Sequence, residues 1–209
     1  MTNLIKTIIF LPFFIVLFCI PILSLGQKHF EEGYVVLNNN DTLFGALMDR
    51  KPHPFGSLYK KIKFKGEKKK RKYGPKQILA YNKGQSVFES VWITDSGDFF
   101  SQNYASVQGY GEPVFLKVVE KGFLTHYHWE FEDADSGYID YIAYFKKEDN
   151  PSLVRVNQGV LGLKRKNLAK FFSDCPPLAQ KIANKEFKTP SEIVQFYNKW
   201  KENQETVKN

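Results

Sequence analysis

The chain has 209 residues, two cysteines and a formal net charge of +8. This length is enough for one domain with a hydrophobic core, and the positive surplus favours acidic partners. No G-x-S-x-G, P-loop or G-x-G-x-x-G pattern occurs in the sequence, so these signatures of hydrolases and nucleotide-binding proteins are missing. We therefore expect no cofactor and identify no catalytic residue.

The first 26 residues are typical of a secretory signal peptide. Lys6 is the only charged residue ahead of the apolar run 7–25, and Ser24 and Gly26 fit the −3 and −1 positions of a cleavage site. Cleavage before Gln27 would lower the net charge to +7. We expect a secreted or periplasmic protein. The alternative is a retained N-terminal membrane anchor, because an apolar run of ~20 residues can span a bilayer.

From Gly33 to about Val156 the sequence alternates between short β-rich segments and turn residues. Val, Ile, Tyr, Phe and Trp dominate the segments, and Asn, Asp, Ser and Gly separate them. The expected strands cover residues 33–37, 42–47, 59–65, 87–93, 114–119, 123–132 and 138–145. Consecutive short strands of this kind predict an antiparallel sheet, folded as a sandwich or an open barrel.

After Gly162 the apolar residues recur at helical spacing. We expect helices over residues 164–172 and 177–184, and a third that begins at Thr189-Pro-Ser-Glu192. That sequence is a capping box with proline at the first helical position. The third helix then has one apolar stripe, formed by Ile193, Phe196, Tyr197 and Trp200. Such a stripe predicts packing against the β-rich region.

Together these patterns predict an α+β fold, with an antiparallel β-rich N-terminal region (sandwich or open barrel) and C-terminal helices packed on it. We expect a signal peptide at 1–26, a single α+β domain at 27–203 and a frayed tail at 204–209. Cys175 is the one cysteine left after cleavage. We expect it to be a small buried apolar residue without a disulfide.

Four short motifs resemble those of uncharacterised secreted proteins of Bacteroidota-type bacteria. They are Gly33–Leu37, Asn40–Gly45, Asp174–Pro176 and Tyr197-Asn198. The chain departs from that pattern at Asn40, where glycine is expected. The resemblance implies an envelope or secreted location, and it implies no reaction.

An uninterrupted basic run is formed by Lys68, Lys69, Lys70, Arg71 and Lys72. In an intracellular protein this run would suggest a nuclear signal, but a secreted protein does not meet the importer. One interpretation is a solvated hairpin tip whose lysines protect an edge strand. The other is contact with a polyanion, either an anionic surface or an acidic glycan, with no specific nucleic acid expected. A protein of the envelope is a further candidate partner.

The expected strand 123–132 contains the best candidate for a chemical site. Because side chains alternate along a strand, His126, His128 and Glu130 share one face. Two histidines and a carboxylate can hold a metal. The other face would be aromatic, formed by Phe123, Tyr127, Trp129 and Phe131. We expect the aromatic face to point to the core and the polar face to solvent, without a metal site.

Two functions remain open at this point. We expect a secreted or periplasmic β-rich binding or structural module of the bacterial cell envelope, without catalytic chemistry. The alternative is a hydrolase with a site built from scattered residues around His126, His128 and Glu130. A hydrolase would require a concave site in which these groups converge.

Overall fold

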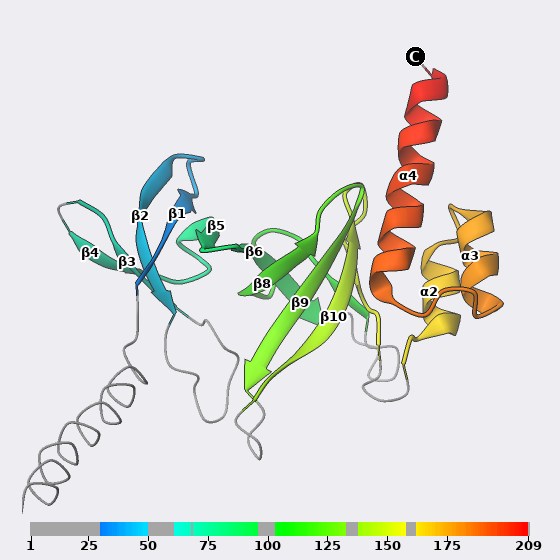
Figure 1. The fold of residues 1–209 in the computed structure, drawn as a ribbon, viewed down its shortest axis with the longest axis horizontal. Coiled ribbons are helices and arrows are strands. Elements are labelled where there is room, and N and C mark those ends of the chain that lie inside the picture. Colours follow the sequence, from blue (N-terminus) through cyan, green and yellow to red (C-terminus); the bar gives the residue numbers. More distant parts are fainter. Residues whose placement is uncertain are drawn as a thin grey trace, which may run out of the picture. The chain divides into compact units, whose positions relative to one another are not determined.

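The structure is a computed structural model that describes residues 30–49, 61–67, 69–95, 103–132, 138–157 and 162–208. Its strands are β1 (Glu31–Leu37), β2 (Thr42–Asp49), β3 (Ile62–Lys65), β4 (Lys70–Tyr73), β5 (Ile78–Lys83), β6 (Ser86–Asp95), β7 (Asn103–Ala105), β8 (Glu112–Glu120), β9 (Leu124–Glu132), β10 (Ile139–Lys147) and β11 (Ser152–Arg155). The helices are α2 (Arg165–Phe171), α3 (Pro176–Ala183) and α4 (Pro190–Lys208) (Figure 1). Residues Glu31–Asn209 form one compact unit.

The first part of the sheet is antiparallel and runs in the order β4-β3-β2-β1-β5-β6. β1 lies between β2 and β5, and it meets both at Gly33. A Cβ atom at Gly33 would lie 2.0 Å from the main-chain oxygen of Asn82 on β5. Glycine is therefore needed there for close strand approach. Asn40, in the β1–β2 turn, has a φ of 68°, a left-handed conformation that asparagine adopts more readily than most residues other than glycine.

The last six strands form a closed ring of pairings. β6 pairs with β7, and the pairings continue through β11, β10, β9 and β8. β8 then returns to β6 along Val87–Ile93. We call β6 to β11 the six-strand ring. Because β6 also pairs with β5, this one long strand belongs to both parts of the sheet.

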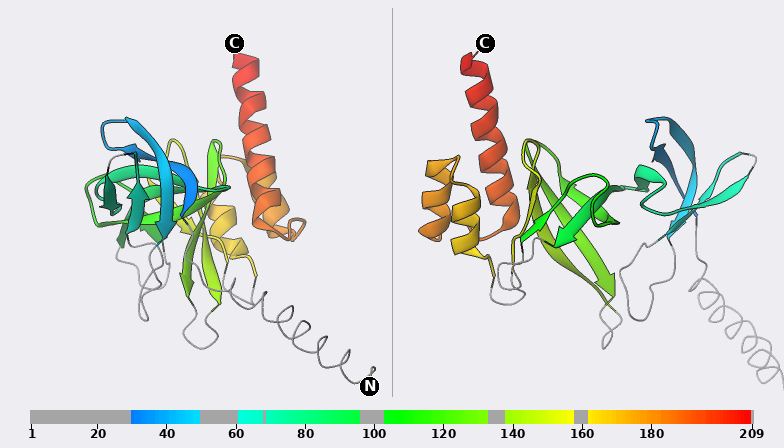
Figure 2. Two further views of the ribbon diagram at one scale, coloured as in Figure 1. Left: turned by 60° about the vertical axis from the view of Figure 1, so that its left-hand side comes forward. Right: turned by 180° about the vertical axis from the view of Figure 1, so that it is seen from behind.

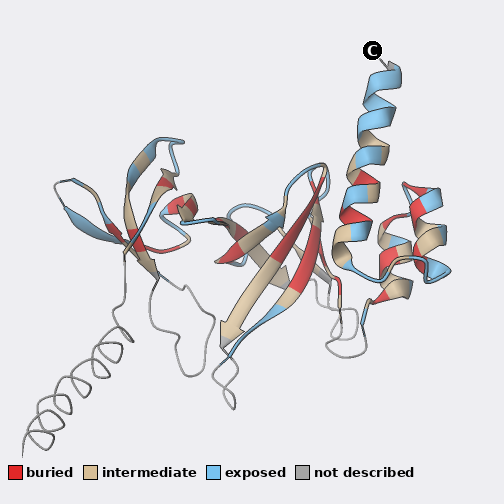
Figure 3. Cartoon of the chain, in the orientation of Figure 1, coloured by how far each residue is buried: buried red, intermediate tan, exposed pale blue. Residues whose placement is uncertain are grey.

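Alternate side chains of the ring face two different cores. Every strand of the ring except β7 supplies a buried residue to the inner core, which contains Val91, Leu116, Tyr127, Tyr144 and Leu153. The outward residues of β9 to β11 pack instead against the helices, in a core that includes Leu124, Ala143, Phe145, Val154 and Val156. The ring is therefore buried on both sides where the helices cover it (Figure 3).

The helices pack against β9 and β10, as two further views show (Figure 2). In the capping box, the Glu192 carboxylate accepts a hydrogen bond from the Thr189 main-chain N–H at 2.8 Å, and the Thr189 hydroxyl accepts one from the Glu192 N–H at 3.4 Å. Ile193 and Tyr197 of the stripe are fully buried. The Asn198 side chain bonds to both the N–H and the C=O of Leu124, at 2.7 and 3.2 Å.

The structure confirms the predicted fold class, with an antiparallel β-rich region and C-terminal helices packed on it. Cys175 is fully buried in the helical core. Residues 204–208, which we expected to fray, continue α4. The signal peptide at 1–26 and the first residues of the expected strand 59–65 lie outside the described residues. No helix in the described part of the chain is long and apolar enough to cross a membrane.

Candidate functional site

The basic run lies on the β3–β4 hairpin. Lys69 is in the turn, where its C=O accepts a hydrogen bond from the Gly66 N–H at 3.2 Å. Lys70, Arg71 and Lys72 begin β4, the outermost strand of the sheet order. All four of these residues are exposed, and Lys68 lies outside the described residues. The predicted hairpin is present, and lysines occupy its open edge as edge protection requires.

The strand register divides the basic residues between two faces. Lys63 pairs with Lys72, and Lys65 pairs with Lys70. Because directly opposed residues share a face, these four lysines form one surface, which we call the lysine face. Arg71 pairs with Phe64 and belongs to the opposite face. The basic run therefore does not form one patch. It supplies only half of the lysine face, and β3 supplies the other half.

The lysine face has no compensating acids in the described part of the chain. No ion pair or hydrogen bond involves its four ammonium groups there. Like charges placed directly opposite each other repel by up to ~1 kcal/mol per pair. Stability of the fold does not explain such an arrangement. Phe44, on β2, lies on the same face through its alternation with Ala46, and its side chain is 74% exposed.

The strand β9 alternates as predicted, but its polar face does not point to solvent. His126 is 3% exposed and packs edge-on against Phe145, with 5.5 Å between ring centroids. His128 stacks on Tyr141 at 3.7 Å, and Glu130 pairs with Lys117 at 3.2 Å. The prediction of a solvent-facing polar strand is wrong for His126, which packs on Phe145 of the helical core, whereas His128 and Glu130 are half-buried.

One member of the predicted aromatic face also lies elsewhere. Tyr127 and Trp129 belong to the inner core of the ring. Phe123 precedes the first residue of β9 and packs with the helical core. The period of two therefore holds only from Leu124 onward.

The structure does not gather the two histidines and Glu130 into a three-ligand set. Among the described residues, no group of three His, Cys, Asp or Glu side chains could hold a metal ion. Burial and the neighbouring His128 lower the pKa of His126 to about 4. Burial and Lys117 lower the pKa of His128 to about 4. Both rings are therefore neutral at pH 7, and their charge is disfavoured by the environment.

A polar cluster lies at one end of the ring interior. The Tyr127 hydroxyl donates to Glu89 Oε2 at 2.5 Å, and Lys121 Nζ lies 2.5 Å from Glu89 Oε1. Burial and the Glu89 carboxylate raise the pKa of Tyr127 far above its ordinary value, so the phenol stays protonated. Sequence inspection missed this cluster, because its members come from β6, the β8–β9 turn and β9.

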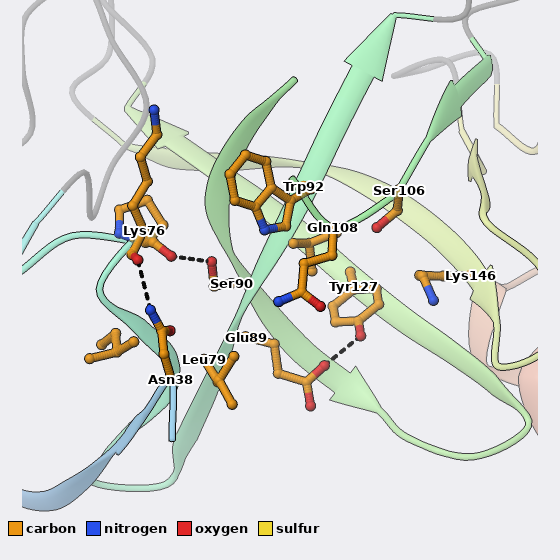
Figure 4. Close-up of a pocket in the computed structure, with 13 residues that line it drawn as sticks. Asn38, Lys76, Leu79, Glu89, Ser90, Trp92, Ser106, Gln108, Tyr127 and Lys146 are labelled. Atoms are coloured by element: carbon orange, nitrogen blue, oxygen red, sulfur yellow. Dashed lines mark hydrogen bonds between the residues drawn. The ribbon is translucent and has the colours of Figure 1, made fainter. Parts of the chain in front are cut away.

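A cavity of about 400 Å³ lies beside this cluster (Figure 4). Its polar wall includes Ser90, Trp92, Ser106, Gln108 and Lys146. Tyr127 and Lys146 also line a second cavity of about 310 Å³, together with Lys121, Gly122 and Thr125. The two hollows therefore adjoin at these shared side chains. Neither is lined by His126, His128 or Glu130, so the residues of the predicted hydrolase site do not converge in either.

Comparisons with protein-family models, with curated proteins and with solved structures found no match to this chain.

Proposed function

We propose that this protein is a secreted or periplasmic binding module of the bacterial cell envelope, and that it holds an acidic glycan on the lysine face. The supporting observation is the register of the β3–β4 hairpin, which places Lys63, Lys65, Lys70 and Lys72 on one surface. Residues two apart on a strand are about 6.5–7 Å apart, and paired strands are about 5 Å apart. Four ammonium groups at these spacings suit a linear chain of repeated anions.

The N-terminal sequence supports the proposed cellular location. The apolar run and the Ser24/Gly26 pair favour export, and an acidic polysaccharide is a polyanion that an exported protein can meet. The net charge of +7 that remains after cleavage would attract such a polymer once it comes within the Debye length, which is about 10 Å at moderate salt.

The test compares two fourfold Lys→Gln variants of equal charge. One removes the lysine face, and the control removes exposed lysines of the helical region, at Lys166, Lys170, Lys188 and Lys199. Retention on a heparin column and binding to sulfated or uronate-rich glycans are measured against salt. We expect the face variant to lose most of its salt-dependent binding, while the control keeps most of it.

Arg71→Gln provides a second control within the basic run. Its side chain is on the opposite face of the hairpin, so we expect only a small loss of glycan binding. Equal losses in both fourfold variants would show that binding follows net charge alone and would contradict the proposal. Binding to anionic vesicles but not to glycans would assign the face to a lipid surface instead.

A further inference from the structure

The cavity beside Glu89 lies where two strands separate along one edge of β6. On that edge, pairing with β5 ends at Glu89, and pairing with β7 begins at Thr94. The other edge of β6 is paired with β8 throughout Val87–Ile93. Within the described part of the chain, no strand pairs with the four residues between the two ladders. We call this gap the β6 fork.

Main-chain groups point into the fork. The two-residue turn at Gly84-Gln85 makes Lys83 and Ser86 a hydrogen-bonded pair. Because such pairs alternate along an antiparallel ladder, the N–H and C=O groups of Ser90 and Trp92 are directed to the same edge. A ligand in the fork can therefore bond to main-chain donors and acceptors that an ordinary sheet would use internally.

The side chains around the fork supply the mixed contacts of a hydroxylated ligand. The Gln108 amide points into the space between Trp92, Glu89 and Tyr127 (Figure 4). In the described structure, neither this amide nor the Trp92 indole N–H has a hydrogen-bond partner. An amide and a carboxylate can donate to and accept from hydroxyl groups, and a half-buried indole ring offers a flat apolar surface.

The charge of the cavity suits one negative group. Of the lysines that line the two hollows, Lys121 pairs with Glu89, and Lys147 pairs with Asp174. The Lys76 side chain points away from the other labelled residues (Figure 4). Lys146 has no ion pair or hydrogen bond among the described residues. Because Lys121 and Glu89 neutralise each other, the ammonium of Lys146 is left to match one negative charge, which favours a monoanion over a dianion.

We propose that the β6 fork binds a small acidic sugar, that is, a hydroxylated ring with one carboxylate. The carboxylate pairs with Lys146, the ring lies on Trp92, and Gln108 and Glu89 bond to its hydroxyl groups. A volume of about 400 Å³ is near the lower limit of ligand sites and fits one or two sugar rings. This site shares no residue with the lysine face, so the inference does not depend on the proposed function.

The test is calorimetric titration of the purified protein with D-glucuronate, D-galacturonate and N-acetylneuraminate, with D-glucose as the neutral match. We expect at least one acidic sugar to bind with a stoichiometry of one, and glucose to bind at least about tenfold more weakly, as one charge-assisted hydrogen bond implies. Lys146→Gln should lower the affinity for the acidic sugar by a similar factor and leave the affinity for glucose unchanged.

Two further variants separate binding from folding. Gln108 is exposed in the β7–β8 loop. Gln108→Ala should therefore keep the melting temperature of the wild type but lower the affinity for both the acidic sugar and glucose. Lys199→Gln, on the exposed surface of α4, should change neither the melting temperature nor the affinity for either sugar. Absence of saturable binding by all three acidic sugars would overturn the proposal. So would wild-type affinity in both Lys146→Gln and Gln108→Ala, or binding of inorganic phosphate as tight as that of the sugars.

Discussion

At the scale of single residues, His126 shows how the neutral form of a side chain becomes part of a core. His126 is paired in register with Phe145 on β10 and with Glu120 on β8, and its ring packs edge-on against Phe145. Glu120 accepts a hydrogen bond from the Ser191 hydroxyl at the start of α4. Neither ring nitrogen has a hydrogen-bond partner in the described structure. Protonation would therefore place an uncompensated charge near His128 in a buried site.

We predict that acid weakens the fold through His126. Its pKa is about 4 in the folded protein and about 6.5 when unfolded. The unfolded chain thus binds more protons between these values, so the free energy of unfolding falls as pH drops from about 6.5 to about 4. The loss from this group is about 3 kcal/mol. Urea unfolding at a series of pH values measures it.

His126→Leu tests whether this residue is responsible. Leucine fills a similar apolar volume and does not titrate, so the loss of stability between pH 6.5 and 4 should become smaller by about the same amount. If the variant loses stability over this range as steeply as the wild type, other groups are responsible for the acid sensitivity.

At the scale of elements, α4 depends on one side chain as well as on its apolar stripe. Asn198 accepts from the N–H of Leu124 and donates to its C=O, as a neighbouring strand would. Gly122 makes room for it, because a Cβ atom there would lie 2.5 Å from Asn198 Nδ2. The Asn198 amide thus satisfies both main-chain groups of Leu124, the first residue of β9.

We predict that Asn198→Ala lowers the free energy of unfolding by about 1–3 kcal/mol, because it leaves two partly buried main-chain groups of Leu124 without partners. Gln195→Ala, at an exposed position of the same helix, should change stability by no more than about 0.5 kcal/mol. Chemical denaturation of both variants gives the comparison. Equal effects would mean that Asn198 acts only through helix propensity.

At the scale of the whole folded unit, a buried cation joins the ring to the helices. Lys147 of β10 is 5% exposed, and its ammonium bonds to Asp174 Oδ1 at 2.6 Å and to the Phe171 C=O at 2.8 Å. The same ammonium lies 4.4 Å from the centroid of the Phe171 ring. The Tyr197 hydroxyl donates to the other oxygen of Asp174 at 2.7 Å. Strand, loop and α4 therefore meet at one ion pair.

We predict that Asp174→Asn destabilises the protein more than the double variant Lys147→Met/Asp174→Asn. The single change leaves the buried ammonium without its counter-ion, at a cost on the order of 2 kcal/mol, reduced because the Asp174 side chain is 39% exposed. The double change removes the charge itself and replaces it with an apolar chain. Glu148→Gln, an exposed neighbour, is the control. A more stable single variant would contradict this prediction.

Local patterns in the sequence determined the elements. The capping box fixed the start of α4, and its stripe of i, i+3, i+4 and i+7 residues required a buried face. The period of two correctly placed His126 and Tyr127 on opposite sides of β9. These features depend on residues a few positions apart, so the sequence alone predicts them. The strands β5, β7 and β11 were not predicted. Of these, β7 and β11, with three and four residues, are too short to show such a pattern.

Contacts between distant residues decided the surfaces. The lysine face required the pairing of Lys63 with Lys72 as well as the basic run itself. The solvent-facing prediction for His126 failed because helices some 40 or more residues later cover that face. The β6 fork exists because β5 and β7 approach one strand from different parts of the chain. Alternation shows which side chains share a face, but only the pairing of strands decides what covers that face or leaves it open.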